Sequence, residues 1–139
     1  MRLHILAATL LLPLAALPAK AEPVWPAAAK VSFISPADGA SISGPLHGVM
    51  GLSGLGVAPA GVDQSNTGHH HLLVAGELPK GAAMMEPMIA DDHFRHFGGG
   101  QTQTDLALPA GTHTLQLIVG DQNHIPHDPA LVSDKITVK

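Results

Sequence analysis

The stretch TQTDLALPAGTHTLQLIVG, residues 102–120, carries the clearest secondary-structure pattern of this chain. Apolar and polar residues alternate over 102–108 and again over 112–120, which is the pattern of strands that bury one face. Between them, Pro109-Ala110-Gly111 supplies the residues of a tight turn. The stretch therefore predicts two antiparallel strands joined by a short connection.

Other short apolar segments, separated by glycine and proline, lie on both sides of this pair. They predict strands at 30–35, 45–52, 69–75 and 133–139, with a further candidate strand in 84–90. No window shows helical periodicity with caps over the necessary length. We therefore predict an all-β fold, an immunoglobulin-like antiparallel β-sandwich. One sheet would contain 69–75, 112–120 and 133–139, and the other 30–35, 45–52 and 102–108.

The N-terminus has the pattern of a secretory signal peptide. Arg2 precedes an apolar run from Ile5 to Leu17, and Ala19-Lys20-Ala21 offers small residues at a cleavage site. We expect cleavage after Ala21, an extended lead-in over 22–29 and a single β-sandwich domain over 30–139. The predicted compartment is extracytoplasmic, namely the periplasm, with no membrane span left after cleavage.

The charge balance excludes one class of partner. Removal of Arg2 and Lys20 with the signal peptide leaves five basic residues against eleven acidic ones, a net charge of −6 with neutral histidines. An acidic domain without a basic stripe is not expected to bind nucleic acid. The chain has no cysteine, which removes thiolate chemistry and cysteine-ligated zinc.

Histidine is the unusual residue, with nine of the ten histidines after the signal peptide. In the predicted topology, three segments place their histidines at one end of the sandwich: His69, His70 and His71; His93 and His96; His124 and His127. His47 and His113 open strands at the other end. A strand such as 112–120 separates the two ends by roughly 25 Å, so one ion could not use both groups.

The histidine end predicts a metal site. His69 and His71 share one face of their strand while His70 points the other way. We predict the ligands His69, His71, His96 and His124, with His70 and His127 as alternates or outer partners. Imidazole suits divalent transition metals, and copper is slightly favoured over zinc by the compartment and by Met84, Met85 and Met88. With ordinary histidine pKa values, binding should weaken from about pH 7 to about pH 5.

The histidine end is compatible with three classes of function. The first is a periplasmic metal-binding module for buffering, delivery or sensing. The second is a metalloenzyme that would use the same histidines to hold its metal. The candidate acids nearby are Asp91, Asp92, Asp121 and Asp128. Their spacing matches no catalytic motif, which argues against an enzyme. The third is a structural or interaction module whose histidines change charge near pH 6.

Four segments also carry a family resemblance: GHHHLLV (68–74), HFGGGQTQTDLALPAGTHTLQL (96–117), GDQNHIPHDP (120–129) and SDKITV (133–138). Together they resemble a family of small secreted bacterial domains of unknown function, number 4399 in the usual family numbering. The resemblance covers most of 31–138. It supports the fold and the histidine set without naming an activity. The positions that match its pattern are His69, His70, His71, His96, Gln101, Thr102, His113, Asp121, His124 and His127.

Overall fold

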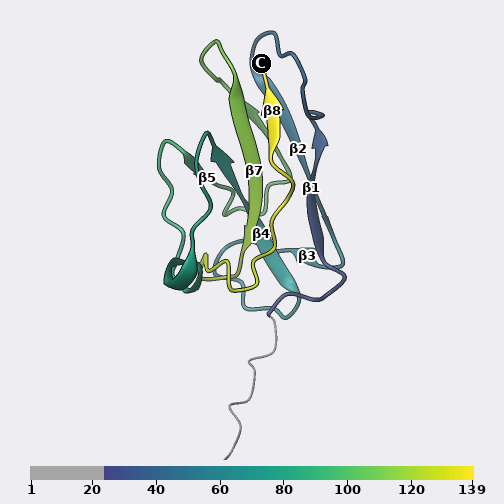
Figure 1. The fold of residues 1–139 in the computed structure, drawn as a ribbon. Helices are drawn as coiled ribbons and strands as arrows, with labels where there is room; N and C mark the ends of the chain where they lie inside the picture. The colour runs from purple at the N-terminus through teal and green to yellow at the C-terminus, as the bar shows by residue number, and fades with distance from the viewer. Residues whose placement is uncertain (1–23) are drawn as a thin grey trace, which may run out of the picture.

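Two β-sheets lie face to face in the computed structural model, which describes residues 24–139 (Figure 1). The first sheet has the order β1-β2-β6 and is antiparallel. It consists of β1 (Lys30–Ser35), β2 (Leu46–Ser53) and β6 (Gln103–Leu106). The prediction that 30–35, 45–52 and 102–108 form one sheet is therefore confirmed.

The second sheet has the order β3-β4-β7-β8, and β5 pairs with β4. It consists of β3 (Gly56–Val57), β4 (Thr67–Val74), β5 (Phe94–His96), β7 (His113–Gly120) and β8 (Ile136–Val138). All of its pairs are antiparallel except β3 with β4. The all-β sandwich is confirmed, with the predicted division of the strands between two sheets. Its specifically immunoglobulin-like character stays a prediction.

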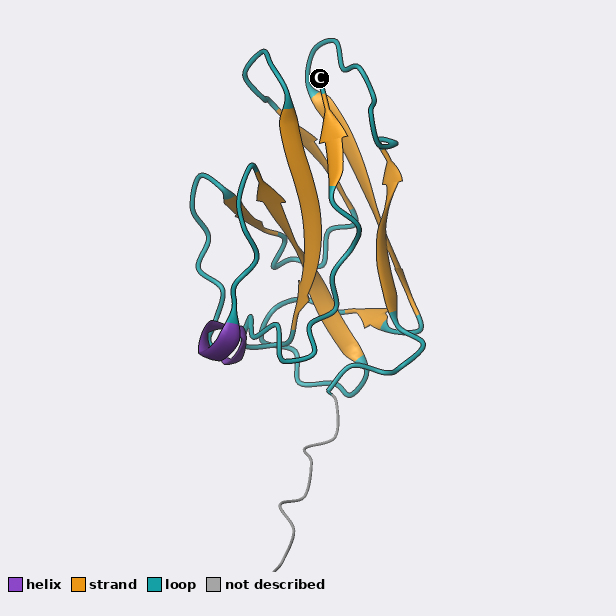
Figure 2. Ribbon diagram, in the orientation of Figure 1, coloured by secondary structure: helices purple, strands orange, loops and turns teal. Residues whose placement is uncertain are grey.

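The segment between β4 and β5 differs from the prediction of a strand at 84–90. It contains a single turn of 3₁₀ helix, η1 (Gly81–Met85), which lies at the edge of the sandwich (Figure 2). Pro87 has no amide N–H to donate to a neighbouring strand. The Met88 N–H donates instead to the His124 carbonyl at 3.0 Å, so this stretch joins a loop and no sheet.

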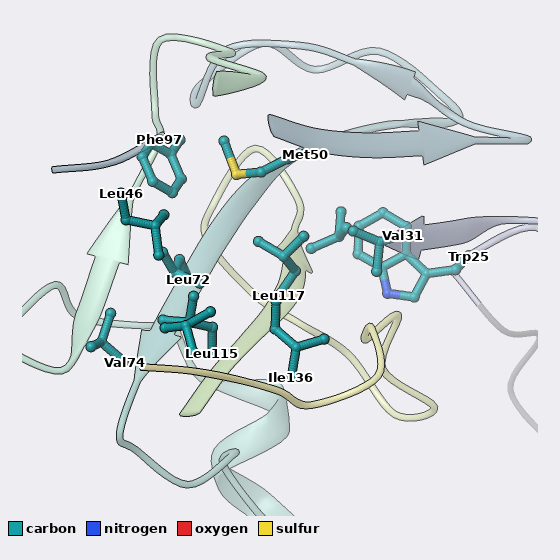
Figure 3. Packing of buried hydrophobic residues seen from close by; sticks show 12 residues of the cluster. Trp25, Val31, Leu46, Met50, Leu72, Val74, Phe97, Leu115, Leu117 and Ile136 are labelled. Atoms are coloured by element: carbon teal, nitrogen blue, oxygen red, sulfur yellow. The ribbon is translucent and has the colours of Figure 1, made fainter. Parts of the chain in front are cut away.

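The main core lies between the sheets (Figure 3). Leu115, Leu117 and Val119 alternate along β7 and are fully buried, as the periodicity of 112–120 predicts. Trp25, which lies in the predicted lead-in, also packs into this core, and Ala29 closes a turn by donating to the Pro26 carbonyl at 2.9 Å. Trp25 therefore packs against the sandwich, whereas Val24, Ala27 and Ala28 of the same segment are exposed.

A second, smaller apolar cluster covers the outer face of β4 and β7. Leu73, Ile118 and Met88 form it, and Met88 comes from the segment that follows η1. Because both faces of β4 are covered, every residue from Gly68 to Val74 is buried. This double burial creates the setting for the histidines of β4.

The register of β4 on β7 defines the two ends of the sandwich. His69 pairs with Gly120 at one end, and Val74 pairs with Leu115 near the other, where His113 begins β7. Leu46 and His113 line the same cavity, so the start of β2 lies at that second end as well. Within residues 24–139, no helix has the length and apolar character needed to cross a membrane. The predicted signal peptide, residues 1–21, lies outside the described residues.

Candidate metal centre

Strand β4 fixes the directions of three consecutive histidines. Because side chains alternate across a strand, His69 and His71 project from the outer face, where Leu73 also lies, while His70 projects between the sheets with Leu72. All three side chains are fully buried. The predicted clamp of His69 and His71 is therefore present.

Strand β5 brings His96 to the same place. His96 pairs with His71 in the antiparallel register, and its Nε2 lies 3.2 Å from Nε2 of His69. The backbone then turns through Gly98, where an added Cβ would overlap the His96 imidazole. A glycine is needed here because the ring lies directly over the backbone. The His96 side chain is exposed, so the cluster is reachable from solvent on this side.

The loop after β7 supplies His124. Its ring centroid lies 4.5 Å from that of His96, 5.1 Å from that of His69 and 5.9 Å from that of His71. His124 has a φ of 68°, a left-handed backbone that few residues other than glycine and asparagine adopt. The four predicted ligands His69, His71, His96 and His124 thus come together from β4, β5 and this loop.

Asp121 gives this loop its shape. Its Oδ1 accepts the N–H groups of Asn123 at 2.8 Å and Ile125 at 2.9 Å, and its Oδ2 accepts from Nε2 of His127 at 2.8 Å. The Asp121 carbonyl accepts the His124 N–H at 2.9 Å. The sequence pointed to Asp121 as a candidate acid and as a position of the family pattern, but not to this role in shaping the loop. An aspartate that accepts the backbone N–H two residues later is typical of an Asx turn, and Asp121 in this loop was the sequence signal for such a turn.

The spacing of the imidazoles suits a single ion. One ring nitrogen from each of His69, His71 and His96 lies within 4.8 Å of the others. For a tetrahedral ion with metal–nitrogen distances of about 2.0 Å, neighbouring donor atoms are about 3.3 Å apart. The 3.2 Å between the Nε2 atoms of His69 and His96 matches that separation.

The cluster favours neutral imidazole, which is the form that binds metal. Burial, together with the neighbouring imidazoles of His69, His96 and His124, lowers the pKa of His71 to about 3. Burial also lowers the pKa of His69 to about 4, with His124 and His96 adding to the effect and Asp121 opposing it. Nδ1 of His69 and both ring nitrogens of His71 are buried without a hydrogen-bond partner. A buried polar atom without a partner is costly, and a bound ion would remove part of that cost.

The two second-rank histidines lie outside the cluster. His70 faces the opposite side of β4, and both of its ring nitrogens are buried there without a hydrogen-bond partner. Burial lowers the pKa of His70, and the backbone groups of Gln101 and Gly51 oppose this shift. His127 lies at the histidine end but bonds to Asp121 and contacts the edge of Trp25, with ring centroids 5.7 Å apart. Of the two, His127 is the one linked to the cluster, through Asp121 and the loop of His124.

The prediction that His93 lies at the histidine end is wrong. Its Nδ1 donates to the Val74 carbonyl at 3.1 Å, at the opposite end of β4 from His69. The reason is β5, which was not predicted: because it runs antiparallel to β4, the residues before His96 lead away from the cluster. His47 and His113 lie at the second end, as predicted, where His47 pairs with Asp105 and His113 bonds to the Pro109 carbonyl.

One comparison with known proteins gives a match. A family model described as "Domain of unknown function (DUF4399)" matches residues 49–139. The chain belongs to the DUF4399 family. The match spans all four clustered histidines of this DUF4399 domain together with Asp121, and it confirms the resemblance found in the sequence. No curated protein and no solved structure matches the chain.

Proposed function

We propose that this DUF4399 domain is an exported metal-binding module, acting in the periplasm in the buffering, delivery or sensing of copper or zinc. The proposed ligands are His69, His71, His96 and His124. Imidazole nitrogen is a good donor for both metals. The acidic charge of the chain is consistent with a cation as the bound species.

A single observation carries the proposal: four imidazoles from three separate segments converge, and two of them are fully buried with unpartnered nitrogens. Both ring nitrogens of His70 on the other face of β4 are likewise unpartnered, so the convergence of the four rings is what distinguishes the proposed site from a single buried histidine. The exposed side chain of His96 offers an ion a way in and out. This combination of a buried pair and an exposed donor favours a binding module that exchanges its metal.

The two alternatives have less support. A pH switch near neutrality needs histidines that titrate there, but burial moves the pKa values of His69 and His71 well below that range. A metalloenzyme needs a positioned acid or base beside the metal. Asp121 already accepts backbone N–H groups of its own loop and bonds to His127, and Asp91 accepts the N–H of His93, away from the cluster.

Titration of untagged protein with Zn²⁺ and with Cu²⁺ tests the proposal. We expect one equivalent of metal to bind tightly at neutral pH, because ring nitrogens of His69, His71 and His96 lie within 4.8 Å of one another and the His124 ring lies beside them. Binding should raise the melting temperature, since a ligand that binds only the folded state stabilises it. Weak uptake of several equivalents, without any change in melting temperature, would indicate scattered surface histidines and would contradict the proposal.

A further inference from the structure

Met88 is attached to the loop that carries His124. The Met88 N–H donates to the His124 carbonyl at 3.0 Å, and four residues earlier the Met84 carbonyl accepts the His127 N–H at 2.9 Å. The methionine segment and the ligand loop therefore lie side by side through two backbone hydrogen bonds. Nothing in the sequence pattern of either segment predicts this pairing.

The side chain of Met88 ends beside the histidine cluster. A Cβ built on Gly120 would lie 2.8 Å from Cε1 of His71, 3.0 Å from Cε of Met88 and 3.2 Å from Cα of His124. The His71 ring and the terminal methyl group of Met88, which is bonded to the thioether sulfur, thus border one small space that a glycine keeps open. Met88 is 9% exposed, whereas Met85 in the same segment is 53% exposed.

We propose that the Met88 thioether is a further ligand of the histidine site and that the site accepts cuprous copper. Thioether sulfur is a soft donor that selects Cu(I), whereas Zn²⁺ in proteins is bound by imidazole, carboxylate and thiolate. Four imidazoles alone would not separate the two metals. This inference rests on the proposed metal-binding function and adds to it the class of ion and a fifth donor residue.

A packing role is the competing explanation, because Met88 also contacts Leu73 and Ile118 in the outer apolar cluster. Met88→Leu separates the two explanations. Leucine keeps the volume and the apolar character, and such exchanges usually cost less than about 1.5 kcal/mol of stability. It removes only the sulfur. Met85→Leu is the matched control, because it makes the same change three residues away on an exposed side chain.

The experiment measures Cu(I) affinity under anaerobic conditions with a competing chromophoric chelator, and Zn²⁺ affinity in parallel. For Met88→Leu we expect Cu(I) affinity to fall about tenfold or more, the loss that even an outer partner of a metal site causes, with Zn²⁺ affinity unchanged. Met85→Leu should match the wild type for both ions. X-ray absorption of the Cu(I) protein should show a sulfur neighbour that Met88→Leu removes.

Two results would overturn the inference while leaving the proposed function intact. Unchanged Cu(I) affinity in Met88→Leu would mean that the sulfur is not a ligand. Equal losses for Cu(I) and Zn²⁺ would mean that Met88 supports the shape of the site through packing. A wild-type protein that binds neither ion would overturn the proposed function as well. Circular dichroism of each variant verifies that it is folded.

Discussion

The double substitution His71→Ala with His124→Ala should nearly abolish tight metal binding. It removes one buried donor from β4 and one from the loop shaped by Asp121, so two of the four imidazoles around the proposed ion are lost. Loss of a single outer partner already lowers the affinity of a metal site roughly 10–100-fold, and the loss of two direct donors should exceed that. Calorimetric or competition titration measures the change.

His47→Ala with His113→Ala is the control pair. It removes the same number of imidazoles from the other end of the sandwich, where His47 pairs with Asp105 and His113 bonds to Pro109. Metal affinity should stay at the wild-type level. If both pairs weaken metal affinity equally, the histidines bind metal as scattered surface groups and not as one site. If only the control pair weakens it, the site lies at the end of the sandwich that carries His47 and His113.

The metal-free protein should lose stability steeply as the pH falls below about 6.5. The folded-state pKa values of His69, about 4, and of His71, about 3, lie below the ordinary value of 6.5, so the unfolded chain binds protons that the folded chain does not. Stability is therefore fully present above the unfolded pKa and declines below it, by up to about 1.4 kcal/mol per pH unit for each of the two histidines. Urea unfolding at about pH 7, 5.5 and 4.5 measures this slope.

The control for this acid effect is His69→Gln with His71→Gln, which removes both titrating groups from the buried cluster. Its stability should fall less between about pH 6.5 and about pH 4 than that of the wild type, because the remaining slope comes from carboxylates and other histidines. Identical slopes in the two proteins would show that His69 and His71 are not held neutral in the folded state.

The depressed pKa values also revise the expected pH range of metal binding. Ordinary histidines would lose metal to protons between about pH 7 and about pH 5. In this cluster, protons compete with the metal ion for His69 only near pH 4 and for His71 only near pH 3. Binding should therefore extend further into the acid range than for a site of exposed histidines.

The sandwich could be predicted because its central strand carries a plain signal. Leu115, Leu117 and Val119 alternate with residues of the other face over 113–120. This strand, β7, pairs with β4 along most of its length and with β8 over a shorter stretch. Strand β5 gives no such signal: its three residues, Phe94 to His96, include two exposed polar ones. It exists because β4 offers it an edge, which is a tertiary effect that periodicity does not carry.

The candidate site was predictable at the level of strand ends. Strand alternation separated His70 from His69 and His71, and the topology brought His96 and His124 to the same end. His93 could not be placed because that required knowing the direction of β5. The position of the Met88 side chain beside Gly120 could not be predicted either, because it depends on how an irregular segment folds back across the sheet.

Elemental analysis of protein purified without an affinity tag is the decisive measurement of metal binding by this domain. We expect about one equivalent of copper or zinc per chain, because a four-imidazole site holds one ion. The double variant His71→Ala with His124→Ala, prepared in the same way, should contain close to none. A wild-type protein free of transition metal, or a double variant whose metal content equals that of the wild type, would rule out a metal site at this histidine cluster.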